Sequence, residues 1–163
     1  MKRRILTTIG GATLAILALG VFAQVWVSAQ TQKGNDQSLI GSWDAQVTLR
    51  DCDSGVPFVT FAAMYTYNQG GTTQQTAIPE PGSTALPGHG AWSHDIGRSY
   101  SGAFQFFILN PNPALTTRVI VRSSINLDLG GDSYSSTDTA EIRNMNGDVL
   151  DRACSTTAAT RFK

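Results

Sequence analysis

Residues 41–50 read Gly-Ser-Trp-Asp-Ala-Gln-Val-Thr-Leu-Arg, and the alternation in this stretch decides the fold class. One set of alternate positions carries Trp43, Ala45, Val47 and Leu49, and the other set carries Asp44, Gln46, Thr48 and Arg50. Successive side chains of an extended chain point to opposite sides, so a period of two separates an apolar face from a polar one. The stretch is therefore predicted to be a strand with one face buried.

The same alternation recurs along most of the chain, interrupted by turn dipeptides such as Gly70-Gly71 and Asn146-Gly147. It predicts further strands at residues 59–67, 72–77, 89–96, 99–109, 115–129 and 134–143, and a last strand after residue 147. In the strand at 115–129 the inward positions are Val119, Val121, Ile125, Leu127 and Leu129. Residues 79–88 hold three of the six prolines, so we expect a loop that stays outside the ladder.

About eight strands joined by short turns predict an antiparallel meander. Such a meander commonly closes into a barrel, which removes the exposed edges of an open sheet. The predicted fold class is all-β: a single eight-stranded up-and-down barrel over residues 39–163, preceded by an N-terminal signal helix. A β-sandwich is the alternative.

The N-terminus has the pattern of a secretion signal. Three basic residues follow Met1, residues 5–29 carry no charge, and the segment ends Val27-Ser28-Ala29. We expect a signal peptide over residues 1–29, cleavage before Gln30, and a polar tether over residues 30–38. An uncleaved anchor is the alternative. The predicted location is periplasmic or secreted.

Removal of the signal leaves nine basic and twelve acidic side chains, a net charge of about −3. No basic stripe survives, which argues against a nucleic-acid partner. We expect no cofactor, and no membrane association after cleavage.

Cys52 and Cys154 are the two cysteines of the chain. In an oxidising compartment we expect a disulfide between them, because a metal site needs more ligands than two cysteines supply. Such a bond joins the end of the first strand to the last strand, so it also favours closure of the barrel. The two Cα atoms are expected about 4.4–6.8 Å apart.

Several aromatic side chains are predicted to point into the barrel: Tyr65, Tyr67, Trp92, Tyr100, Phe104 and Phe106. A small barrel is either filled by side chains or holds one small ligand. Six large rings favour filling, whereas the short side chains of residues 72–76 and of the last strands leave room. We expect Asp138 and His94 to face inward as well. Asp138 then either fixes a ligand's polar group or bonds a nearby tyrosine or arginine.

Two resemblances add to this interpretation. The Gly41-x-Trp43 pair on the first strand resembles the signature of the lipocalin and calycin superfamily, which implies that Trp43 closes one end and Arg161 packs over it. The set Pro87-Gly88-His89-Gly90-Ala91-Trp92, Tyr100, Phe104, Phe106, Asn146-Gly147, Cys154 and Arg161-Phe162 is similar to a group of small exported bacterial proteins. Their barrels resemble the allene oxide cyclase type, and this likeness implies fold and location.

No catalytic or metal site is assigned. His89 and His94 are five positions apart, so on a strand they face opposite sides, and no serine stands in a G-x-S-x-G elbow. The first hypothesis is a non-enzymatic binder of a small apolar or aromatic molecule, held by the six aromatic residues with Asp138 and His94 as its polar contacts. The alternatives are an allene oxide cyclase-like isomerase and a structural or adhesion protein of the envelope.

Overall fold

The computed structural model describes residues 38–78, 84–112 and 116–163. The predicted signal peptide and residues 30–37 of the predicted tether lie outside these ranges. Within them, no helix is long and apolar enough to cross a membrane.

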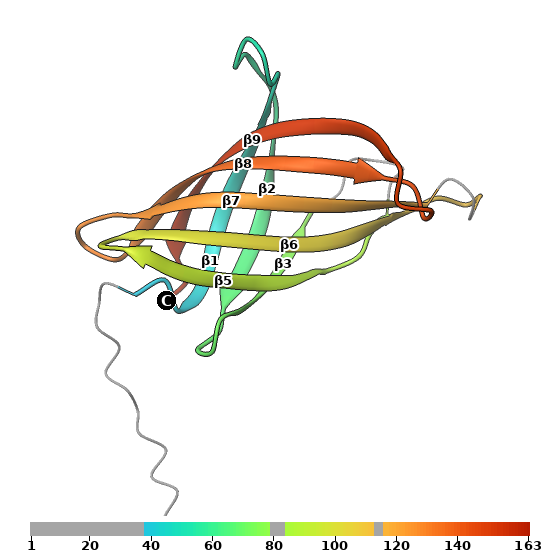
Figure 1. Cartoon of the computed structure of the whole chain (residues 1–163). Coiled ribbons are helices and arrows are strands. Elements are labelled where there is room, and N and C mark those ends of the chain that lie inside the picture. The colour runs from blue at the N-terminus through green and yellow to red at the C-terminus, as the bar shows by residue number, and fades with distance from the viewer. Residues whose placement is uncertain (1–37, 79–83, 113–115) are drawn as a thin grey trace, which may run out of the picture. The chain divides into compact units, whose positions relative to one another are not determined.

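The described residues form one antiparallel sheet that closes on itself (Figure 1). Its strands are β1 (Gly41–Arg50), β2 (Pro57–Tyr67), β3 (Thr72–Ala77), β4 (Thr84–Ala85), β5 (Gly88–Ile96), β6 (Ser99–Leu109), β7 (Thr117–Leu127), β8 (Ser133–Arg143) and β9 (Val149–Arg161). The order runs β6-β5-β3-β2-β1-β9-β8-β7, and pairing of β6 with β7 completes the ring. The predicted eight-stranded antiparallel barrel is therefore confirmed, with β4 as a short addition to β6.

The pairing register of neighbouring strands places their apolar alternate positions on the same face of the sheet. Trp43 lies opposite Tyr65 on β2 and opposite Arg161 on β9, so odd-numbered positions of these three strands share the inner face. A slip of one residue would move every apolar side chain to the solvent. The buried apolar core comprises Leu39, Trp43, Ala45, Val47, Ala63, Tyr65, Tyr67, Tyr100, Phe104, Val119, Val121, Ile125, Leu127, Tyr134 and Ala159.

The expectation that residues 79–88 stay outside the ladder is wrong. Thr84 and Ala85 pair with Leu109 and Ile108 at the end of β6, and Gly88 already belongs to β5. The Leu86 amide also donates to the carbonyl of Phe107 at 2.9 Å. Proline lacks only its own N–H, so the prolines of this segment interrupt pairing at their positions without preventing it between them.

Leu129 was expected to face inward, and this prediction is also wrong. Strand β7 ends at Leu127, and Leu129 lies in the turn to β8 with 74% of its surface exposed. The Asp128 amide donates to Ser133 at 2.9 Å and closes this turn. The alternation of apolar and polar residues predicts which side a residue faces only within a paired strand.

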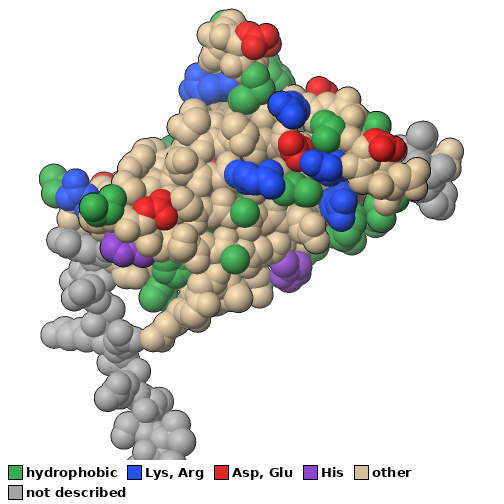
Figure 2. All heavy atoms as spheres, viewed as in Figure 1, with side chains coloured by type: hydrophobic (Ala, Val, Ile, Leu, Met, Phe, Trp, Pro, Cys, Tyr) green, Lys and Arg blue, Asp and Glu red, His purple; other side chains and the backbone are tan. Residues whose placement is uncertain are grey.

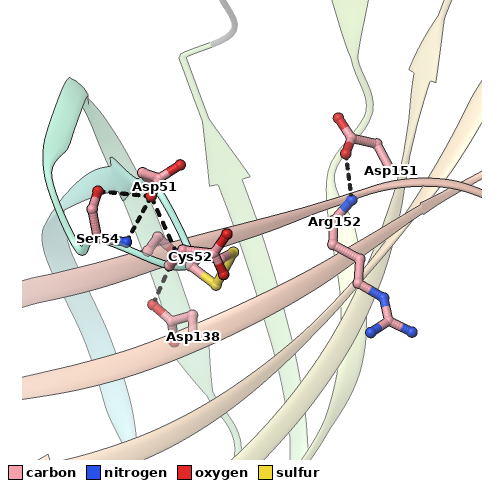
Figure 3. The surroundings of a disulfide bond; sticks show 9 residues. Asp51, Cys52, Ser54, Asp138, Asp151 and Arg152 are labelled. Atoms are coloured by element: carbon pink, nitrogen blue, oxygen red, sulfur yellow. Dashed lines mark hydrogen bonds between the residues drawn. A yellow bond between two sulfur atoms is a disulfide. The ribbon is translucent and has the colours of Figure 1, made fainter.

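The predicted disulfide is present and closes the barrel seam. Cys52 and Cys154 are bonded with their Cα atoms 5.2 Å apart, inside the expected range. Figure 3 shows this bond beside the turn that leads from β1 to β2. In that turn the Asp51 carboxylate accepts hydrogen bonds from the amide and the hydroxyl of Ser54, both at 2.7 Å. The hydroxyl bond, followed by the amide bond, lowers the pKa of Asp51.

Candidate ligand-binding cavity

One end of the barrel is sealed around Trp43. Its indole Nε1 donates to the Leu39 carbonyl at 2.9 Å, and both side chains are fully buried. The Arg161 guanidinium lies 4.3 Å from the centre of the Trp43 ring, within the 6 Å that favours a cation–π contact. Its nitrogens donate to the carbonyls of Ser38, Ile40 and Gly131. Arg161 therefore fixes the segment before β1 across this end.

Aromatic rings fill the half of the barrel next to this seal. Tyr134 meets Trp43 edge-on with ring centres 4.9 Å apart, and Tyr67 contacts both Tyr134 and Trp92 at 6.0 Å. Tyr100 adds a ring 5.8 Å from Trp92. Burial is the main cause that raises the pKa of both Tyr67 and Tyr134, so both phenols stay neutral. Rings in contact therefore occupy the interior next to the seal.

The other half of the barrel contains a cavity of about 310 Å³. Its lining is mainly apolar and comes from seven of the eight barrel strands, all but β5, together with β4 and the residue after β3: Val47, Leu49, Phe61, Tyr65, Gln75, Ala77, Ile78, Ala85, Phe104, Phe106, Ile108, Val119, Val121, Asp138, Ala140, Ile142, Ala153 and Ser155. Short alanine side chains on β3, β4, β8 and β9 leave the space. Ile78, one of the lining residues, is 68% exposed.

Asp138 is the charged group of this cavity and lies at its inner end, next to the filled half. Its carboxylate accepts hydrogen bonds from the hydroxyls of Ser136 at 2.9 Å, Thr157 at 2.8 Å and Ser155 at 3.3 Å. The side chain is only 4% exposed. The expectation of a bond to tyrosine or arginine is therefore wrong, because three hydroxyls from β8 and β9 take that place.

Aromatic side chains form one wall beside the carboxylate. Phe104 meets Tyr65 edge-on at 5.8 Å between ring centres and stacks on Phe106 at 6.3 Å. Burial, and secondarily the charge of Asp138, raises the pKa of Tyr65. Across from Phe104, β5 carries Gly88 and Gly90. A Cβ added at Gly88 would crowd the Phe104 ring, and one added at Gly90 would overlap the β6 backbone. The two glycines let β5 lie close to this wall.

The structure divides the predicted site residues between two places. Tyr65, Phe104, Phe106 and Asp138 line the cavity, whereas Tyr67, Trp92 and Tyr100 pack in the filled half. His94 is exposed near the end of β5, where its ring lies 4.8 Å from that of Tyr100 and its Nε2 lies 2.8 Å from the Gly97 carbonyl oxygen. His94 is therefore not part of the lining and has no contact with Asp138.

The cavity lining includes several residues beyond the predicted site. Phe61 shares the inward face of Tyr65, and Gln75 is an inward position of β3 with 6% exposure. Ala140 and Ala153 lie opposite each other on β8 and β9. The alternation of the sequence predicts that these residues face inward. It does not predict that they line a cavity, because that depends on the side chains of the other strands.

Exposed apolar side chains are found at the end of the barrel opposite Trp43. They lie in the connections and strand ends at this end of the barrel: Val56, Phe58, Ile78, Leu86, Leu109, Met145, Val149 and Leu150. A broader hollow of about 990 Å³ lies on the outer wall, where outward-facing Asp44, Gln46 and Thr160 contribute to its lining. The interior cavity combines apolar walls with one convergent polar group, which is the usual character of a small-molecule site.

These features define the class as a small antiparallel β-barrel that is sealed at one end and hollow at the other. Comparison of the chain with protein-family models, with curated proteins and with solved structures finds no match.

Proposed function

We propose that this protein is an exported, non-enzymatic binder that takes one small apolar or aromatic molecule into the open half of its barrel. The observation that carries the proposal is the cavity of about 310 Å³ with apolar walls. Ligand pockets in proteins start at roughly this size, about 300 Å³.

The distribution of side chains supports binding over simple structural packing. A barrel gains stability when its interior is filled, because an empty space forfeits the contacts of the atoms that line it. Here one half is filled by rings, while the other is lined by short side chains at Ala77, Ala85, Ala140 and Ala153. Space retained in one half only is what a binding site requires.

The likeness to the lipocalin and calycin superfamily supports the same function. Trp43 with Arg161 over its ring seals one end, as the resemblance implies. A sealed end and an open end give a ligand one route of entry. The exposed apolar side chains at the end opposite Trp43 suit an apolar ligand.

Export is part of the proposal. The Cys52–Cys154 disulfide is compatible with an oxidising compartment, where such bonds persist. The basic and then apolar N-terminal sequence supports removal of residues 1–29 during export. The intact mass of protein recovered from the periplasm or medium is expected to match a chain that begins at Gln30 with its disulfide formed. A mass that includes residues 1–29 contradicts cleavage.

The binding proposal is tested with N-phenylnaphthylamine, a neutral aromatic probe whose fluorescence rises in apolar surroundings. We expect saturable binding of one molecule per chain to the protein purified from cells that express the full sequence. Ala153→Trp fills the cavity and is expected to weaken binding at least about tenfold, equivalent to about 1.4 kcal/mol. Ala158→Trp places the same ring on the outer face of the same strand and is expected to bind normally. Absence of binding, or equal loss in both variants, contradicts the proposal.

A further inference from the structure

The cavity has a feature that an apolar ligand alone does not explain, which is the carboxylate of Asp138 at its inner end. A buried charge is costly unless it is paired or hydrogen-bonded. Three hydroxyls bond Asp138, two of them to one of its oxygens and one to the other. A carboxylate offers about four acceptor positions, so one remains.

In the part of the chain that the structure describes, no Lys or Arg lines the cavity beside this carboxylate. Among the described residues, none of the ion pairs includes Asp138. Charged side chains on the outer wall pair with one another: Arg143 on β8 lies 2.6 Å from Glu141, and Arg152 on β9 lies 3.8 Å from the same Glu141. Figure 2 shows basic and acidic side chains on the outer surface. Asp138 is therefore the only Asp, Glu, Lys or Arg among the described residues that line the cavity.

The walls beside Asp138 suit a cation as well. Tyr65, Phe104 and Phe106 present rings to the same space, with Tyr65 and Phe104 in contact and both buried. Aromatic faces attract ammonium groups, most strongly where water is excluded. A carboxylate with aromatic walls is a chemical match for an organic cation, whereas it repels an anionic head group.

We propose, on the basis of the binding function above, that the ligand is a cationic amphiphile. Its protonated amine meets the free acceptor position of Asp138 between the aromatic rings. Its apolar part lies along Val119, Ala140 and Ile142 toward the open end. The amine then supplies the positive charge that the carboxylate lacks, and the two groups form a charge-assisted hydrogen bond.

The test compares ligands with one tail and different heads: octylammonium, octyltrimethylammonium, octanol and octanoate. Each displaces N-phenylnaphthylamine, and the displacement gives its affinity. We expect octylammonium to bind about tenfold or more tightly than octanol, because hydrogen bonds to charged groups are about twice as strong as neutral ones. Octyltrimethylammonium is expected to rank above octanol through the rings, and octanoate below it.

Asp138→Asn removes the charge and keeps the shape of the side chain. In this variant octylammonium and octanol are expected to bind with similar affinity. Asp44→Asn is the matched control, since it makes the same charge change at an exposed outward position of β1 and is expected to keep the full preference. If loss of preference is equal in both variants, net charge rather than Asp138 is the cause and the inference is overturned.

The wild-type ranking decides the question even if Asp138→Asn does not fold. Equal binding of ammonium and alcohol overturns the cationic ligand while the binding function itself stands. Failure of every ligand, and of N-phenylnaphthylamine, overturns the binding function. The two failures are therefore distinguishable.

Discussion

At the scale of single residues, the chemistry of the cavity depends on how Asp138 is held. Ser136 lies opposite Thr157, and Asp138 lies opposite Ser155, in the register of β8 and β9. Alternation alone places Ser136 and Asp138 on one face. It does not say which residues of the next strand face them, because the register also depends on the turn between the strands. The inward carboxylate was therefore predictable from the sequence, whereas its hydroxyl partners were not.

Thr157→Val tests this arrangement. Valine keeps the shape of threonine and removes the hydroxyl that donates to Asp138 at 2.8 Å. We expect the free energy of unfolding to fall by about 1–3 kcal/mol, the usual effect of leaving a buried polar group without a partner. Thr160→Val, at an exposed outward position of β9, is expected to stay within about 0.5 kcal/mol of the wild type. Urea unfolding measures both, and equal effects would show that the bond to Asp138 contributes nothing.

At the scale of elements, the strands show what alternation predicts and where it stops. It located the eight barrel strands because each has one buried and one solvent-facing side. It did not predict β4, because a strand of two residues is too short to show alternation. It also predicted that Leu129 faces inward, although β7 ends before this residue. Both errors concern where strand pairing begins or ends. This depends on backbone hydrogen bonds, which the alternation of side chains does not predict.

Of the two glycines that let β5 lie close to β6, Gly90 leaves the least room for a side chain. A Cβ at Gly90 would overlap the carbonyl oxygen of Ala103 and lie 2.5 Å from the Cα atom of Phe104. Both obstacles are backbone, so Gly90→Ala is expected to push the strands apart and cost more than about 3 kcal/mol or prevent folding.

Gly102→Ala is the matched control on the neighbouring strand. The nearest atom to its added Cβ is the Ile125 side chain at 3.6 Å, an ordinary contact. We expect this variant to be as stable as the wild type or more stable by about 0.4–1 kcal/mol. Thermal unfolding of the two variants decides between them, and a Gly90→Ala protein of normal stability would contradict the described packing of β5 on β6.

At the scale of the whole molecule, the barrel consists of a filled half and a hollow half. Six inward rings favoured a filled interior, and this expectation holds for one half only. Alternation tells whether a side chain points inward, but its height along the barrel depends on register and strand tilt. The sequence therefore predicted which residues face the interior and not how they divide between the seal and the cavity.

Three buried tyrosines, two in the filled half and one beside the cavity, make the stability sensitive to alkaline pH. Burial raises the pKa of Tyr65, Tyr67 and Tyr134 well above the ordinary value. Below about pH 10 these phenols are neutral in both states, so their contribution to stability is complete. Above it the unfolded chain loses protons that the folded chain keeps, so stability falls as the pH rises toward the folded pKa values. Each tyrosine contributes about 1.4 kcal/mol per pH unit, or roughly 4 kcal/mol for three.

Urea unfolding at a series of pH values from 8 upward measures this fall, and ultraviolet absorbance reports tyrosinate formation on unfolding. Tyr65→Phe is expected to reduce the slope above about pH 10 by about one third, because it removes one of the three linked protons. A free energy of unfolding that stays constant through this range would contradict burial of the three phenols.

The central claim is that a ligand enters the hollow half of the barrel, and nuclear magnetic resonance of the isotope-labelled protein tests it most directly. On titration with N-phenylnaphthylamine we predict signal changes that saturate at one molecule per chain. They are expected at inward positions of the hollow half, such as Phe106, Ala140 and Ile142. Signals of Trp43 and Tyr134 in the filled half are expected to move little. Changes confined to the outer wall around Gln46 and Ala158 would contradict the account.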